Sequence, residues 1–197
     1  MLKAIVLGGS ANVFKEYDEA LKLFLNEEPD AYASCNDTAT IWPGRLDYFC
    51  TLHPDNAREW LAKRRANGHP MGCQVWSYKK RGGSRGVTPF PEIQKVASDW
   101  QGSSGLFCVR VLLQEGFERI ICCGVPIEKQ YSHIIRPSNP NWKPGDHWHE
   151  ALDFTKGWKQ RFPEMKEKVR SMSGYTQRLL GAPTEHWLHT ETPLVRY

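Results

Sequence analysis

The sequence predicts an α/β fold in which a mainly parallel sheet is flanked by helices, and three observations support this. Continuous apolar runs at residues 2–7 and 119–123 are typical of strands buried on both faces of a parallel sheet. Amphipathic stretches of helical length stand between such runs, most clearly at residues 103–115. Turns of small residues join the two kinds of segment, which is the alternation that α/β proteins show.

Each element follows from the pattern in chain order. The sequence predicts strands at residues 2–7, 30–35, 46–52, 73–78, 119–123 and 168–172. It predicts helices at residues 17–25, 57–66, 103–115, from Asp146 to about 160, and 176–180. We expect Asp55 to cap the second helix and Gly116 to end the third. Segments 79–91 and 130–145 are predicted to be loops, and the tail from Thr184 to be irregular.

Length and composition favour one domain spanning residues 1–197. A chain of 197 residues with 40% hydrophobic residues can bury a substantial core, and it shows no repeat or linker. The six cysteines lie mostly in apolar runs without a C-x-x-C pair, which favours free, buried thiols. The N-terminus is too short for a signal peptide, and no apolar run reaches membrane-spanning length. We therefore expect a cytoplasmic protein without a membrane span.

Charge gives a weaker indication of function. The net charge of +4 is too small to indicate nucleic-acid binding. Residues 58–86 nevertheless hold one acid, Glu59, and eight basic residues: Arg58, Lys63, Arg64, Arg65, Lys79, Lys80, Arg81 and Arg85. A solvated helix end and loop is the preferred interpretation, and a positive rim that attracts a phosphorylated ligand is the alternative. A nucleic-acid surface ranks third, because no recognised binding signature accompanies these residues.

Two turns of small residues are the main candidates for a ligand site. The first follows the first strand and contains Gly8, Gly9, Ser10 and Asn12; the second opens the third helix and contains Ser103, Ser104 and Gly105. We expect both turns to present unpaired backbone N–H groups at one edge of the sheet, where nucleotide phosphates bind. The first turn matches neither the P-loop nor the dinucleotide fingerprint. A plain tight turn and a Ser103 N-cap are the structural alternatives.

Polar residues at other strand ends extend this candidate site. Asn36 follows the second strand and offers both a donor and an acceptor, which suits a base or ribose, although Asn36-Asp37 also fits a simple turn. His53 follows the third strand. His147 and His149 diverge if they lie on a helix, so we expect no metal site there. Either histidine is a candidate general acid or base.

Five short motifs together resemble a known superfamily. They occupy residues 5–12, 34–36, 52–54, 103–105 and 119–125. In order and approximate spacing they resemble the sialyltransferase-like glycosyltransferases of bacteria and the related Rossmann-like proteins of motility-associated glycosylation, some of which occur in phage genomes. In that superfamily a G-x-G-P-S-type loop, a C-N pair, an N-P pair, a T-S-G motif and a G-[IV]-D strand end follow one another.

The resemblance implies a single Rossmann-like domain that binds an activated nucleotide sugar, with a CMP sugar as the preferred candidate, and transfers the sugar by direct displacement. The two small-residue turns and His53 would then lie around the nucleotide, with phosphate or ribose held by backbone N–H groups, and Asn36 would read the base or ribose. His147 or His149 would act on the acceptor hydroxyl or the leaving phosphate. No further cofactor is expected.

Three departures from the family pattern keep a second function open. Gly9 stands where the family usually has Asn, His53 stands for the Asn before Pro, and Pro126 replaces the Asp of G-[IV]-D. The segment after residue 127 is short, and there Tyr131 and His133 join the two later histidines as candidates by position. The alternative is therefore a non-catalytic module that binds or sequesters a nucleotide.

Overall fold

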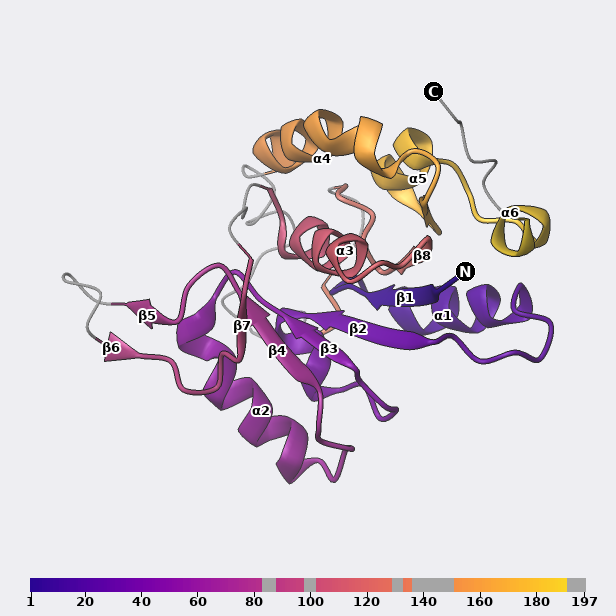
Figure 1. Ribbon diagram of the computed structural model, residues 1–197. Coiled ribbons are helices and arrows are strands. Elements are labelled where there is room, and N and C mark those ends of the chain that lie inside the picture. The colour runs from indigo at the N-terminus through magenta and orange to yellow at the C-terminus, as the bar shows by residue number, and fades with distance from the viewer. Residues whose placement is uncertain (83–87, 98–101, 129–132, 136–150, 191–197) are drawn as a thin grey trace.

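A parallel sheet of seven strands forms the centre of the protein, whose computed structural model describes residues 1–82, 88–97, 102–128, 133–135 and 151–190 (Figure 1). The strand order is β7-β4-β3-β2-β1-β8-β9. The strands are β1 (Lys3–Leu7), β2 (Ala31–Cys35), β3 (Tyr48–Cys50), β4 (Gln74–Ser77), β7 (Lys95–Val96), β8 (Arg119–Cys123) and β9 (Val169–Ser171). A separate antiparallel pair consists of β5 (Arg81–Gly82) and β6 (Thr88–Pro89). The predicted α/β, Rossmann-like fold is confirmed.

Helices cover both faces of the sheet (Figure 1). They are α1 (Val13–Lys22), α2 (Ala57–Ala66), α3 (Ser104–Gln114), α4 (Ala151–Met165), α5 (Gly174–Leu180) and α6 (Glu185–His189). Two 3-10 helices, η1 (Asn36–Thr40) and η2 (Pro54–Asn56), follow β2 and β3 directly. Apolar side chains of α1, α2 and α6 pack on one face, and those of α3, α4 and α5 pack on the other.

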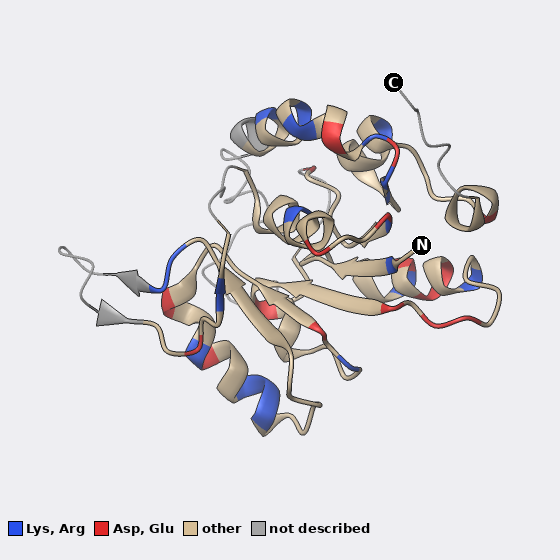
Figure 2. Cartoon of the chain, in the orientation of Figure 1, with Lys and Arg blue, Asp and Glu red and all other residues tan. Residues whose placement is uncertain are grey.

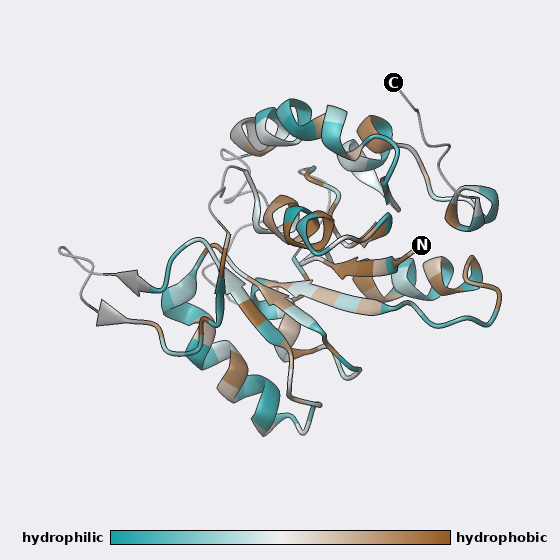
Figure 3. Ribbon diagram, viewed as in Figure 1, coloured by the Kyte–Doolittle hydropathy of each residue, from teal (hydrophilic) through white to brown (hydrophobic). Residues whose placement is uncertain are grey.

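The core is two-sided because the central strands are buried on both faces. Along β1, Ala4 and Val6 face the α3 layer, while Ile5 and Leu7 face the α1 layer, and all four are fully buried. Helix α3 is apolar around most of its circumference, as Figure 3 shows, because α4 covers the side that faces away from the sheet. Because β1 and α3 are each covered on opposite sides, both appear in the sequence as continuous apolar runs.

Several predicted elements differ from the observed ones. Helix α1 begins at Val13, earlier than predicted, because Val13 is fully buried against the sheet. Asn56 rather than Asp55 is the N-cap residue of α2, because both residues belong to η2, which leads directly into the helix at Ala57. The predicted loop at 79–91 contains β5 and β6, and the tail predicted to be irregular from Thr184 contains α6. All six cysteines are free and buried, as predicted.

Candidate functional site

The carboxyl ends of β1 and β8 mark the point where the chain reverses its path across the sheet. From β1 the chain proceeds to β2, β3 and β4 on one side, and it later returns through α3 to β8 on the other side of β1. The helices α1 and α3 therefore lie on opposite faces of the sheet at this point. In open α/β sheets a ligand crevice lies outside the strand ends at such a switch. Gly8 follows β1 here, and Gly124 follows β8.

Gly8 holds the two strand ends together. Its N–H donates to the carbonyl of Cys123 at 2.7 Å, and the N–H of Ser10 donates to the carbonyl of Gly124 at 3.1 Å. A Cβ on Gly8 would overlap the Gly124 carbonyl oxygen, so the close approach requires glycine. Two N–H groups that the sequence predicts to be bare are thus used within the protein.

A buried carboxylate secures the other side of the same junction. Glu16 in the first turn of α1 is only 5% exposed, and its Oε2 accepts a hydrogen bond of 2.7 Å from the Gly124 N–H. Gly124 has φ +73, a conformation that glycine adopts without strain. Glu16 was not among the predicted site residues, although a charged residue on the buried stripe of Val13 and Ala20 was a usable signal.

His133 lies directly over the first turn and beside an acid. Its Nε2 is 3.4 Å from Oδ1 of Asp37, a buried residue of η1. The N–H of Ile134 donates to the Gly9 carbonyl at 2.8 Å. A Cβ on Gly9 would come within 2.5 Å of His133 Nε2, so the imidazole occupies the space that a side chain at position 9 would take. His133 was a candidate by position alone, and its pairing with Asp37 was not predicted.

The hydrogen bonds of His133 fix its neutral tautomer. The N–H of Ile135 points at Nδ1 from 3.2 Å, so Nδ1 is an acceptor. The proton of the neutral ring therefore belongs on Nε2, which faces Asp37. The pair places an imidazole and a carboxylate next to the Gly9 backbone.

Asn36 is held at the same edge by the strand beside it. It has φ +54, and its Oδ1 accepts a hydrogen bond of 2.9 Å from the hydroxyl of Thr51. The Thr51 hydroxyl also accepts from the N–H of His53 at 2.8 Å. His53 is exposed and meets the ring of Trp60 edge-on. Asn36 and His53, predicted separately, are thus linked through Thr51.

The second turn is buried beneath α4. Ser103 caps α3 as predicted, because its Oγ accepts from the Leu106 N–H at 3.3 Å, and it also accepts from Trp158 Nε1 at 3.2 Å. A Cβ on Gly105 would lie 2.8 Å from Val125, so this glycine allows α3 to pack against the end of β8. Ser103 and Ser104 are each 8% exposed. Whether this turn binds a ligand stays a prediction.

One further predicted residue, Asn12, makes no side-chain hydrogen bond with the described residues of this group. Asn12 is exposed at the N-cap position of α1 and makes no side-chain capping bond. His147, His149 and Tyr131 lie outside the described residues. Within the described ranges, no group of three or more His, Cys, Asp or Glu side chains is placed to hold a metal ion.

The thiol of Cys35, next to Asn36, is unreactive. Burial raises the pKa of the Cys35 thiol, and the nearby Cys108 and Asp37 add to this effect. Its Sγ donates weakly to the Leu7 carbonyl at 3.6 Å. Burial likewise raises the pKa of the Cys122 and Cys123 thiols. Since the thiolate is the reactive form, these cysteines serve the core and not nucleophilic chemistry.

The predicted basic rim is smaller than the sequence suggests. Arg64 is fully buried and donates to the carbonyls of Ala39, Trp42, Gly44 and Pro70 at 2.7–2.9 Å. It therefore holds the end of η1 in place. In addition, Arg58 pairs with Glu92, and Lys63 pairs with Glu59. Figure 2 shows basic residues gathered at the end of α2, but the burial of Arg64 and the two ion pairs reduce the exposed positive charge, which does not favour a nucleic-acid surface.

Comparison with known proteins was informative at the level of structure. No family model matches the chain, and no curated protein matches it in sequence. The fold is similar to the crystal structure of the sialyltransferase CST-II in complex with a trisaccharide acceptor and CMP, with a TM-score of 0.56 and 11% sequence identity. The match covers 96% of this chain and 89% of that chain. The protein therefore has a sialyltransferase-like fold. Among the described residues, no helix is both long and apolar enough to span a membrane.

Proposed function

We propose that the carboxyl edge of the sheet binds a nucleotide-activated sugar, with a CMP sugar preferred, and that the protein transfers the sugar to a hydroxyl acceptor. The observation that carries the proposal is the junction at Gly8 and Gly9, where the switch point meets Asp37 and His133. The motif order and the similarity in fold to a sialyltransferase crystallised with CMP support it.

His133 explains one departure from the family pattern. Gly9 stands where the family usually has Asn, and here the His133 ring fills the space of that side chain. An imidazole, like the amide of Asn, is a polar group that can form hydrogen bonds. We infer that His133 replaces the family Asn at the nucleotide, with Asp37 orienting the ring.

The proposed reaction is a single displacement. The acceptor hydroxyl oxygen attacks the anomeric carbon, the bond from that carbon to the phosphate oxygen breaks, and the nucleoside monophosphate leaves. The hydroxyl proton passes to a general base, for which His147 and His149 are the proposed residues. His133, beside the Gly9 backbone, would lie next to the leaving phosphate. The Asn36 amide, held by Thr51, would contact the base or ribose.

Calorimetry with CMP, UMP, GMP and AMP tests the binding step. We expect CMP to bind best, and we expect His133→Ala and Asn36→Ala each to weaken binding by about tenfold, as the loss of one charged or well-placed hydrogen bond does. Lys22→Ala, at the exposed end of α1 near the opposite edge of the sheet, is the control. The proposal is wrong if none of the four nucleotides binds the folded protein.

One observation favours the non-catalytic alternative. Pro126, which replaces the family Asp, is buried, and its carbonyl accepts the N–H of Tyr175 at 2.8 Å. A Cβ on Gly174 would overlap this carbonyl, so α5 closes over position 126. The site therefore lacks one family carboxylate. Formation of CMP from CMP-sialic acid, measured with and without saccharide acceptors, separates the two functions. A sequestering module binds the nucleotide but does not cleave CMP-sialic acid.

A further inference from the structure

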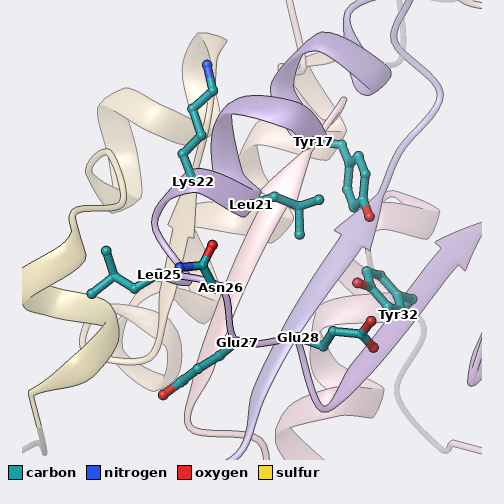
Figure 4. A pocket seen from close by; sticks show the side chains of 8 residues that line it. All are labelled: Tyr17, Leu21, Lys22, Leu25, Asn26, Glu27, Glu28 and Tyr32. Atoms are coloured by element: carbon teal, nitrogen blue, oxygen red, sulfur yellow. The ribbon is translucent and has the colours of Figure 1, made fainter.

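A hollow lies at the amino edge of the sheet, opposite the candidate nucleotide site and beside the amino end of β2. It has a volume of about 530 Å³, within the usual range of small-molecule sites. Its lining comes from α1, the following turn and β2: Tyr17, Leu21, Lys22, Leu25, Asn26, Glu27, Glu28 and Tyr32. Figure 4 shows Tyr17, Leu21, Glu28 and Tyr32 around a common space, whereas the Lys22 side chain extends away from it.

Aromatic rings form one wall of this hollow. Tyr17 meets the ring of Trp42 edge-on with centroids 4.6 Å apart, and Tyr32 lies about 6 Å from both rings. Burial raises the pKa of Tyr17, with a further contribution from its hydrogen bond to Tyr32, so the phenol stays neutral. The wall is thus rigid, electron-rich and uncharged.

Negative charge borders the same wall. The Glu27 carboxylate is neutralised by Lys3, whose Nζ lies 2.6 Å from its Oε2. No cation pairs with the exposed Glu28 carboxylate within the described ranges of the chain, and Figure 4 shows this carboxylate beside Tyr32. Figure 2 shows the turn between α1 and β2 as an acidic segment, although the chain carries a net charge of +4. A cation is therefore the complementary ligand charge.

The aromatic wall already binds one guanidinium group from within the protein. Arg45 lies over the Tyr32 ring, with Cζ 5.4 Å from the centroid, while its Nε donates to Asp47 at 3.1 Å. A planar guanidinium stacks on an aromatic ring and binds a carboxylate through paired N–H groups. The hollow offers the same combination, Tyr17 with Glu28, to a group from outside.

We propose that this hollow is a binding site for a guanidinium group, such as an arginine side chain, with Glu28 as the carboxylate partner and Tyr17 as the aromatic wall. The site is separate from the nucleotide edge and does not depend on the function proposed there. Its turn carries Leu25 and Asn26, both at positive φ, which is a strained conformation that binding sites often retain.

Argininamide and its uncharged isostere citrullinamide are suitable probes. We expect argininamide to bind at least about five times more tightly, with amide shifts in the NMR spectrum confined to residues 17–32, and we expect added salt to weaken it. Glu28→Gln, an exposed change that should not affect folding, should weaken argininamide binding by about tenfold. Tyr17→Phe keeps the ring and should reduce affinity less.

Asp55→Asn removes the same charge at the opposite sheet edge and should leave argininamide binding unchanged. Equal affinity for the two amides, shifts outside the hollow, or unchanged binding by Glu28→Gln would each overturn the proposal. CMP titration of Glu28→Gln keeps the two sites distinguishable, since this variant should bind CMP as the unaltered protein does.

Discussion

The two small-residue turns look alike in the sequence, and the structure uses them differently. At Gly8–Ser10 the glycines bring two strand ends together, and the polar pair of Asp37 and His133 lies over the loop. At Ser103–Gly105 the serine hydroxyl is shared between the cap of α3 and Trp158, and the glycine makes room for Val125. Small residues therefore indicate that two segments of the chain approach closely, and the neighbouring segment determines whether that approach serves packing or a polar site.

Replacing Gly8 tests the junction most severely. Gly8→Ala would place a Cβ on the backbone carbonyl of Gly124, which cannot shift without parting β1 from β8. The free energy of unfolding should fall by about 3 kcal/mol or more, as severe overpacking does. Urea denaturation measures it. Gly68→Asn is the control, because a side chain at position 68 has open space around it and Asn tolerates the positive φ of this residue. An equal effect of the two changes would contradict the close approach.

Removing the Ser103 hydroxyl tests whether the second turn is structural. Ser103→Ala loses the cap of α3 and leaves the Trp158 indole N–H without its partner. Stability should fall by about 2 kcal/mol, from the lost cap and the unpaired buried donor. Ser103→Thr retains the hydroxyl and should recover most of the loss. If CMP affinity falls much more than stability predicts, then this turn also serves the ligand.

The steric relation between Gly9 and His133 is open to a double-mutant cycle. Gly9→Asn alone should displace the imidazole and destabilise the protein, whereas the same change in a His133→Ala background has room for its side chain. The coupling free energy should be about 1 kcal/mol in favour of the double variant. Thermal unfolding and CMP titration of all four proteins measure it. Additive effects would show that the two positions do not share space.

Asn12 gives the smallest expected effect on stability and sharpens the contrast with Ser103. Both occupy N-cap positions, but Asn12 is exposed and makes no capping bond. Asn12→Ala should change the free energy of unfolding by less than about 0.5 kcal/mol. CMP affinity should fall by about tenfold, because Asn12 belongs to the first small-residue turn, which was predicted to lie around the nucleotide. Unchanged affinity would remove Asn12 from the site.

The local sequence pattern was sufficient to predict an element whose buried positions repeat regularly along its length. The bounds of α2 and β8 agree with the prediction, because a polar helix with a few buried positions and a strand buried on both faces each leave a plain signature. Helix α6 was missed for the opposite reason. Its five residues are held by Trp187, whose ring contacts the guanidinium groups of Arg119 and Arg170, and neither partner is near it in the sequence.

The candidate site also combines features that the local sequence predicts with contacts that it does not predict. The edge of the sheet and the turn at Gly8 follow from strand ends and glycines, which are local features. The contact of His133 with Asp37, the bond of Glu16 to Gly124 and the burial of Arg64 join residues far apart in the chain. No periodicity encodes such pairs, since each depends on where two separate elements come to rest.

By itself the sequence determined the alternation of strands and helices, the parallel sheet and the edge at which the small-residue turns lie, because hydrophobic periodicity and strand ends are properties of single segments. Only the tertiary structure decided which turn is covered by α4, which side chain fills the space at Gly9, and that a separate acidic and aromatic hollow lies at the opposite edge. These features arise from the packing of segments against one another, so they exist only once the sheet has brought those segments together.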